Sequence, residues 1–377
     1  MRGDFVIKWR EKFYGVLVSC LLFTSTAGAN PLEIHIINVQ WGMSVLIRGP
    51  DGTLVLFDGG NSGRGKSDVV PYLKSLGVTP NSQFACMVLS HHHEDHFGGL
   101  TEIIDGGYIH FKKIYDHGHG RRGGGDSFNK FKTSVKKTDA GVITDIRLGE
   151  TILLGDGAKV TCVAANGRVV GNHRPVPEVS DENDRSICLL VQYGEFDFLS
   201  CGDLGGGRVG TERDCTHRNP GNQVNMESSV AAALLDDRYL TSDGVEILHI
   251  NHHGSESSSN SEYINKLTPR VAVISVGTGQ APNFQLPRKN VVDNVLLGRG
   301  PGSYCMTHIP ELVLQTADGP MERGSKASNA GYSVGDIVVS TNGARTFKVW
   351  GTGEVGQGDS EIVKAKLPRT FNLDGVQ

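Results

Sequence analysis

Four potential metal ligands stand close together in the segment 90–99: His91, His93, Asp95 and His96. The apolar run 84–89 just before them predicts a buried strand. Neutral imidazole and carboxylate groups are ligands that Zn²⁺ and similar divalent ions accept. The pair Gly98-Gly99 that follows predicts a sharp turn of the chain. We therefore predict a metal site here rather than a solvated, histidine-rich loop.

Further candidate ligands follow two later apolar runs. Asp203 comes after the run 196–201, and His252 and His253 come after the run 245–250. Side chains at the ends of adjacent strands can converge without long loops between them. We expect these groups to meet the histidine cluster at one edge of the sheets.

The spacing of the ligands divides them between two ions. In an extended segment, His91 and His93 point to the same side and can share one ion. Asp95 and His96 then turn toward a second ion, and the two oxygens of Asp203 can bridge the pair. Two ions roughly 3.5–4 Å apart can hold one hydroxide between them. A bound metal lowers the pKa of water to about 7, so no serine or cysteine nucleophile is needed, and Asp95 is the residue we predict to be catalytic.

The composition is that of an ordinary globular protein. The 377 residues are 38% hydrophobic and 21% charged, which suits one large domain or two small ones. The 50 glycines predict many tight turns, which favours a β-rich architecture. The formal net charge is −4. Bulk electrostatics therefore do not indicate nucleic-acid binding, although a nucleic acid remains an allowed partner.

The N-terminus is typical of a targeting segment. A basic region is followed by an apolar run over 14–24 and by small residues at 27–29. The apolar run is shorter than the roughly 20 residues that a membrane span needs. We predict a secretory signal peptide over 1–29 and a periplasmic or secreted protein. A lipoprotein signal ending at Cys20 is the alternative.

The chain has seven cysteines, one of them within the predicted signal peptide. Four others lie in apolar, strand-like runs: Cys86, Cys162, Cys188 and Cys201. Cysteine in such runs behaves as a small hydrophobic residue. We therefore predict no disulfide framework, and Cys215 with Cys305 is the one pair that merits a test.

The rest of the chain alternates strand-like and helix-like segments. Strands are predicted at 32–39 and 53–57, for example, and an amphipathic helix at 68–76. This order predicts sheet layers covered by helices in a single α/β domain over 30–350. Residues 351–377 are predicted to form a C-terminal tail.

Three arginines are candidates for contact with an anionic substrate. Arg121 and Arg122 lie in the Gly-rich segment 116–126, which is expected to form either a rim over the site or a plain surface loop. Arg185 follows Asn183 in a polar segment between two strands. We name Arg121, Asn183 and Arg185 as candidate substrate residues.

The pattern His91-x-His93-x-Asp95-His96 resembles the signature of the metallo-β-lactamase fold. Within that superfamily the chain is similar to the hydrolase domain of the ComEC/Rec2 competence proteins and to related phosphorylcholine esterases. The further segments that carry the resemblance, in the family's order, are 44–52, 58–60, 183–186, 202–203, 252–255 and 274–277, with Asn283 and Pro287. Together they span about residues 32–350.

The resemblance implies a four-layered αββα fold and two bound ions, zinc by default with manganese as the alternative. It implies that Asp203 bridges the ions and that either His252 or His253 completes the second site. Asn183 and Ser186 stand where other branches of the superfamily place a further histidine. The first ion would then have fewer protein ligands, or would take water or substrate instead.

Two features depart from the family. Its acidic turn, Asp-x-Gly-Gln-Gly-Asp, corresponds here to residues 38–43 and has lost both carboxylates, which puts in doubt the roles of those acids, including in nuclease activity. The histidine that commonly precedes Pro287 is also missing. Because the membrane spans of ComEC are not seen, we expect a free-standing hydrolase rather than a DNA channel.

These observations favour a secreted, metal-dependent hydrolase that uses a metal-bound hydroxide. Its expected substrate is a phosphodiester or another anionic small molecule or polymer end. A β-lactam or lactone hydrolase is the first alternative. A non-catalytic metal-binding module is the second, and the intact ligand set argues against it.

Overall fold

The computed structural model describes residues 30–82, 84–119, 125–171, 179–207, 215, 222–277, 284–300, 303–317, 326–328, 330–352 and 368–373. The predicted signal peptide, Arg121, Arg122 and Asn283 lie outside the described residues. No helix in the described part of the chain is long and apolar enough to cross a membrane.

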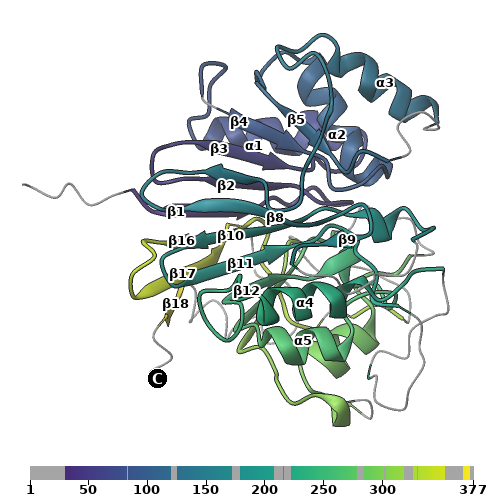
Figure 1. Cartoon of the computed structure of the whole chain (residues 1–377), viewed down its shortest axis with the longest axis vertical. Coiled ribbons are helices and arrows are strands. Elements are labelled where there is room, and N and C mark those ends of the chain that lie inside the picture. Colours follow the sequence, from purple (N-terminus) through teal and green to yellow (C-terminus); the bar gives the residue numbers. More distant parts are fainter. Residues whose placement is uncertain are drawn as a thin grey trace, which may run out of the picture.

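Two β-sheets lie face to face at the centre of the molecule (Figure 1). The strands of the first sheet, from edge to edge, are β18 (Arg369–Asn372), β17 (Thr346–Gly351), β16 (Ile337–Thr341), β1 (Leu32–Ile36), β2 (Val45–Arg48), β3 (Leu54–Phe57), β4 (Phe84–Val88), β5 (Ile114–Asp116) and β6 (Thr144–Asp145). Those of the second are β15 (Tyr332–Ser333), β14 (Leu312–Gln315), β13 (Val271–Ile274), β12 (Ile247–His249), β11 (Phe196–Ser200), β10 (Cys188–Tyr193), β8 (Lys159–Ala165) and β7 (Thr151–Leu153), with β9 (Arg168–Val169) paired to β8.

Helices cover the outer face of each sheet (Figure 1). The first sheet carries α1 (Val70–Ser75), α2 (Glu94–Asp105) and α3 (Asp126–Val135), and the second carries α4 (Met226–Asp236) and α5 (Ser261–Leu267). Short helical turns complete the elements: η1 (Gly65–Val69), η2 (Asn183–Arg185), η3 (Asn251–Gly254), η4 (Asn290–Leu296) and η5 (Ser303–Cys305). This layering confirms the predicted αββα fold.

Both faces of the central strands are buried, and the alternation of side chains explains how. On β2, Val45 and Ile47 point into the core between the two sheets, whereas Leu46 points toward the helices. Val55 and Leu56 on β3 divide in the same way. Such strands read as continuous apolar runs because each face meets another layer.

The topology brings the candidate ligands to one end of the sandwich. β3, β4 and β5 run parallel to one another, and so do β11, β12 and β13. His91 follows the end of β4, Asp203 follows the end of β11, and His253 follows the end of β12. Carboxyl ends of parallel strands share one edge of a sheet. The two sheets lie face to face, so the segment after β4 meets the segments after β11 and β12 at this edge.

The prediction of a plain tail over 351–377 is wrong for residues 369–372. These form β18, an edge strand that pairs antiparallel with β17. Phe371 is buried, and its ring stacks on Phe347 at 4.8 Å between centroids. The buried ring pair fixes this strand on the sheet.

The glycine pair of the ligand segment does not form the predicted turn. Gly98 and Gly99 lie inside α2. A Cβ on Gly99 would overlap the carbonyl oxygen of Gly59 and lie 2.7 Å from the nitrogen of Gly65. The glycines therefore allow α2 to lie directly against the backbone that follows β3.

The absence of disulfides was predicted wrongly. Cys188 and Cys201 form one disulfide, and Cys215 and Cys305 form another. Cys188 opposes Cys201 because β10 and β11 pair antiparallel with Leu189 opposite Ser200. Cys86 and Cys162 are free and buried, as their apolar surroundings predicted.

The buried carboxyl of Glu246, just before β12, makes the stability of the protein depend on pH. Burial raises the pKa of Glu246 from 4.5 to about 7, although the backbone N–H of Asp197, which donates to Glu246 Oε2, offsets part of the rise. A raised folded-state pKa means that the stabilisation is complete below the unfolded pKa and is lost as the pH rises through about 7. Through Glu246, the free energy of unfolding of the wild type should fall by about 3 kcal/mol between pH 4.5 and 8. We expect Glu246→Gln to lack this fall, because glutamine does not ionise.

Denaturant unfolding of wild type and Glu246→Gln across this pH range measures the difference. Glu195→Gln is the matched control, because Glu195 is exposed in the turn between β10 and β11. If the free energy of unfolding changed with pH in the same way in wild type and Glu246→Gln, Glu246 would not have the raised pKa in the folded protein.

Candidate metal centre

Six of the predicted ligands come together at the shared edge of the two sheets. One group contains Asp95, His96, Asp203 and His253, and a second contains His91, His93 and Asp203. Within each group the ligand atoms lie within 4.8 Å of one another. Asp203 belongs to both groups.

The first group surrounds one oxygen of Asp203. Asp203 Oδ1 lies 3.3 Å from His96 Nε2 and 3.5 Å from His253 Nε2. Asp95 Oδ2 lies 3.4 Å from His253 Nε2 and 3.9 Å from His96 Nε2. Two imidazoles and two carboxylate oxygens thus enclose a single small space.

The second group faces the other oxygen of Asp203. His91 Nε2 lies 3.8 Å from Asp203 Oδ2 and 3.0 Å from His93 Nδ1. Because its two oxygens face different histidine sets, the Asp203 carboxylate is placed to join two cation positions.

Orphaned polar atoms show that a cation fits the first group. His96 Nε2, His253 Nε2 and Asp203 Oδ1 are all buried and have no hydrogen-bond partner. Buried polar atoms without partners are costly, so native proteins rarely leave them unpaired. A divalent ion among these atoms would satisfy all three at once.

The two adjacent histidines of η3 take different places. His253 is buried and faces Asp203 Oδ1, whereas His252 Nε2 lies 3.7 Å from Oδ2 and its side chain is 21% exposed. Both residues have positive φ angles, 51° for His252 and 54° for His253. Left-handed backbone at two successive non-glycine residues is uncommon, and it directs both rings toward Asp203.

Hydrogen bonds behind the ligands orient two of the imidazoles. Asp58 Oδ2 lies 2.6 Å from His96 Nδ1, and Asp58 also accepts bonds from the amide and hydroxyl of Ser90. His253 Nδ1 lies 2.9 Å from the carbonyl oxygen of Ser275. A partner on Nδ1 leaves Nε2 free to bind a metal. The segment 58–60 carries part of the family resemblance, but no role was predicted for Asp58 from the sequence.

The charges of the site reinforce one another. Burial opposes ionisation of Asp203, but His96, His253 and His252 outweigh it and hold the pKa of the carboxyl well below its usual value. Burial also opposes the charge on His96, yet Asp203, Asp95 and Asp58 raise the pKa of this imidazole. The carboxylate that would bridge two cations is therefore ionised at neutral pH.

Two of the predicted substrate residues are described. Asn183, in η2, is buried, and its Oδ1 has no hydrogen-bond partner. Arg185 instead binds the neighbouring loop, donating to Asn166 Oδ1 at 2.7 Å and to the carbonyl of Val179 at 2.7 Å. Its guanidinium thus holds this part of the chain together, and its contact with a substrate stays a prediction.

His92, which lies between two of the predicted ligands, has hydrogen-bond partners of its own. Its backbone N–H donates to Glu182 Oε1 at 2.9 Å, and its ring Nε2 donates to Asp116 at 2.9 Å. His117 Nε2 donates to the same Glu182 oxygen at 2.8 Å. These hydrogen bonds form a clamp that holds the backbone between His91 and His93.

Removing this clamp should weaken the cation position of His91 and His93. We expect Glu182→Ala to lower the affinity of this position about tenfold, in the range for residues that support metal ligands. Metal affinity is measured by competition with a chromogenic chelator. Glu94→Ala is the matched control, because Glu94 is exposed and binds only Ser62 among the described hydrogen bonds. Equal affinity in wild type and Glu182→Ala would show that the clamp does not support the ligands.

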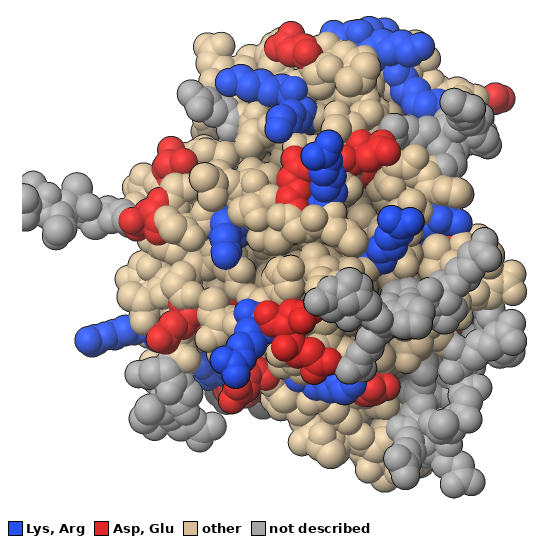
Figure 2. All heavy atoms as spheres, viewed as in Figure 1, with Lys and Arg blue, Asp and Glu red and all other residues tan. Residues whose placement is uncertain are grey.

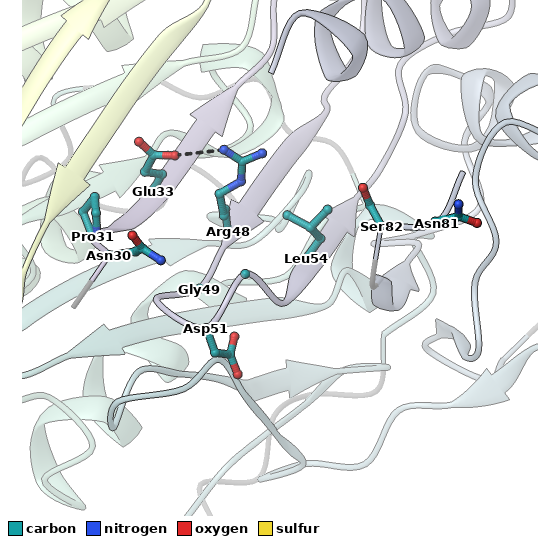
Figure 3. A pocket seen from close by; sticks show the side chains of 10 residues that line it. Asn30, Pro31, Glu33, Arg48, Gly49, Asp51, Leu54, Asn81 and Ser82 are labelled. Carbon is teal, nitrogen blue, oxygen red and sulfur yellow. Dashed lines mark ion pairs between the residues drawn. The ribbon is translucent and has the colours of Figure 1, made fainter. Parts of the chain in front are cut away.

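A separate cavity of about 700 Å³ lies at the opposite end of β2 and β3 (Figure 3). It is lined by Gly49 and Asp51 of the turn between these strands, and by Glu33 and Arg48, whose charged groups are 3.5 Å apart. The metal ligands follow the other end of the first sheet, so this cavity is not part of the metal centre.

The family assignment follows from the match of a sequence profile to the chain. The profile of the metallo-beta-lactamase superfamily matches residues 42–277. The chain belongs to this superfamily. The matched range contains all six grouped ligands, and the protein is accordingly a metallo-β-lactamase superfamily hydrolase with candidate metal-binding residues.

Two curated members resemble the chain at low identity. Recombination protein 2 of Haemophilus influenzae is 22% identical over 288 residues, which cover 75% of this chain and 29% of that protein. Competence protein ComA of Neisseria gonorrhoeae is 24% identical over 270 residues, covering 71% of this chain and 30% of that protein. The predicted likeness to competence proteins is confirmed, but the chain spans under a third of the length of these relatives.

Solved structures to which the chain is similar include YhfI from Bacillus subtilis and Zn²⁺-bound PqqB from Methylobacterium extorquens. YhfI is 12% identical, with a TM-score of 0.37, and the match covers 70% of this chain and 93% of YhfI. PqqB is 15% identical, with a TM-score of 0.36, and the match covers 63% of this chain and 77% of PqqB.

Proposed function

We propose that this protein is a secreted hydrolase with two zinc ions that acts on a phosphodiester or a related anionic substrate. The placement of Asp203 between two histidine groups supports the two-ion centre. The ligand set, imidazole with carboxylate, suits zinc. Secretion is supported by the signal-like sequence of residues 1–29.

The bound ions would supply an activated water near neutral pH and electrostatic stabilisation of the substrate's negative charge. The chain's own residues fix the geometry of this chemistry. Asp203 stays ionised, with one oxygen toward each group, and Asp58 holds His96 in position through Nδ1. Asp95 is the outer carboxylate, because its side chain is 16% exposed against 3% for Asp203. Asp95 is therefore the carboxylate that an incoming substrate meets.

Charge balance favours an anionic substrate. Two divalent ions and the carboxylates of Asp95 and Asp203 leave a net charge of about +2 at the centre, or about +1 with a bound hydroxide, since the histidine ligands are neutral when they bind metal. A phosphodiester carries one negative charge and two oxygens that can face the ions. The centre therefore attracts it without help from the arginines that the sequence analysis named.

A nucleic acid is one class of polymer that offers such an ester. The names of the two curated relatives, a recombination and a competence protein, agree with this class. On the face shown in Figure 2, however, Lys and Arg alternate with Asp and Glu and form no continuous basic stripe. The formal net charge of −4 likewise gives no bulk attraction to a nucleic acid, so recognition would depend on the site itself.

The test is hydrolysis of bis-p-nitrophenyl phosphate, nitrocefin and a lactone by the purified, zinc-loaded protein. We expect phosphodiester turnover that a chelator abolishes and added zinc restores. Turnover of nitrocefin or the lactone alone would overturn the substrate class. No chelator-sensitive turnover of any of the three would overturn the enzymatic function. N-terminal sequencing of exported protein should begin at Asn30, and a chain that keeps Met1 would refute secretion.

A further inference from the structure

Two aromatic side chains lie at the rim of the metal centre. The ring centroid of Trp41 is 5.8 Å from that of the ligand His253, with the rings tilted by 31°. The ring of Phe284 lies 4.9 Å from that of Trp41. Trp41 belongs to the loop after β1, and Phe284 precedes η4, so residues far apart in sequence build one surface.

This aromatic pair remains partly open to solvent. Phe284 is 43% exposed, whereas every other phenylalanine in the described residues is buried. Trp41 is half-buried and packs at the edge of the core beneath α4 and α5. Single exposed hydrophobic residues are common on protein surfaces. An exposed pair beside a metal ligand, however, stands where a bound substrate would cover it.

The loop that carries Trp41 is held rigidly against the centre. Met43 N–H donates to the carbonyl oxygen of the ligand Asp95 at 3.3 Å. Gly42 has a φ of 100°, and a Cβ there would overlap that same carbonyl. The backbone of Trp41 is thus fixed relative to Asp95, and a rigid support is what a positioned binding surface needs.

We propose that Trp41 and Phe284 form a stacking platform for an uncharged planar ring of the substrate, next to its anionic ester. This inference rests on the proposed function and names the substrate class: a nucleoside phosphate ester. Aromatic side chains stack on nucleobases, and each such contact contributes about 1–3 kcal/mol. Trp41 lies in the segment 38–43, where the family's acidic turn has been replaced.

Aromatic side chains recognise both planar rings and quaternary ammonium groups, and the charge of the centre decides between these two. Trp and Phe faces also attract quaternary ammonium groups. A cation at this place would meet the net positive charge of the metal-loaded site within a few ångströms, which is unfavourable. An uncharged base attached to a phosphate avoids this repulsion, because the phosphate alone faces the ions.

The experiment compares three probes that share a phosphate, by calorimetric titration of the zinc-loaded full chain. AMP carries a base, ribose 5-phosphate lacks one, and phosphocholine carries a quaternary ammonium. We expect AMP to bind at least about tenfold more tightly than ribose 5-phosphate. Trp41→Ala and Phe284→Ala should each remove most of this difference and leave the affinity for ribose 5-phosphate unchanged. Trp41→Phe should restore part of it.

Tyr304→Ala is the matched control, because Tyr304 is an exposed aromatic residue, at 66%, outside this site. Equal binding of AMP and ribose 5-phosphate by wild type would overturn the platform and leave the proposed function intact. Tighter binding of phosphocholine than of AMP would overturn the proposal that the platform binds an uncharged ring. Failure of every phosphate probe to bind the zinc-loaded protein would overturn the proposed anionic substrate, and the platform with it.

Discussion

Asp203→Asn should reduce the hydrolytic rate by more than about a hundredfold, since even residues that only support metal ligands can cost that much in affinity or activity. Asparagine keeps the shape of the side chain but loses its charge and one of its two ligand oxygens. Both oxygens are needed, because Oδ1 faces His96 and His253 while Oδ2 faces His91. Phosphodiester turnover and bound metal per chain are the measurements.

The same substitution at Asp197 is the control. Asp197 is also buried and lies on β11, but its oxygens accept bonds from Gln192 and Thr241 rather than facing a histidine group. Burial already raises the pKa of this carboxyl. Asp197→Asn should therefore keep its metal and its turnover. If Asp203→Asn kept the turnover of wild type, Asp203 would not be a ligand of the metal centre.

Gly99→Ala should destabilise the protein despite lying in a helix. Alanine in place of an exposed helical glycine normally stabilises by about 1 kcal/mol. In α2 the added Cβ would instead overlap the backbone of Gly59 and approach Gly65. Overpacking of this kind costs roughly 1–3 kcal/mol, and backbone atoms cannot move aside as side chains do. We expect the free energy of unfolding to fall by about 3 kcal/mol or more.

The displacement should also reach the metal centre, because α2 begins at Glu94 and carries Asp95 and His96 in its first turn. Chemical denaturation and metal affinity are the two measurements. Gly125→Ala is the control, since a Cβ at Gly125 meets nothing within 4 Å. A Gly99→Ala protein as stable as wild type would show that the close contact of α2 with the strand loop is not required.

The ligand segment was the part of the site that sequence predicted best. His91 to His96 follow a buried strand, and that local pattern needs no knowledge of the fold. The partners behind them were not predictable in this way. Asp58 and Glu182 reach His96 and His92 across 38 and 90 residues of chain. Only the sandwich brings these carboxylates next to the histidines.

Two errors had different physical origins. Glycine serves both sharp turns and close backbone contacts, so the pair Gly98-Gly99 could not distinguish them before the packing of α2 was known. The disulfide of Cys188 and Cys201 was within reach of the sequence. The turn at 194–195 sets the register of β10 and β11, and that register places the two cysteines opposite each other.

The missed strand β18 shows a limit of reading local pattern. Its four residues, Arg369–Asn372, contain one large apolar side chain, which is too little to mark a strand. It forms because Phe371 packs on Phe347 at the sheet edge. Tertiary contact, not local sequence, defines this element.

Anomalous diffraction at the zinc edge, from crystals of the zinc-loaded protein, tests the two-ion centre most directly. We predict two peaks, one among Asp95, His96 and His253 and one beside His91 and His93, with Asp203 in contact with both. No peak at this edge of the sheets, or a single peak that Asp203 does not touch, would contradict the bridged two-ion centre.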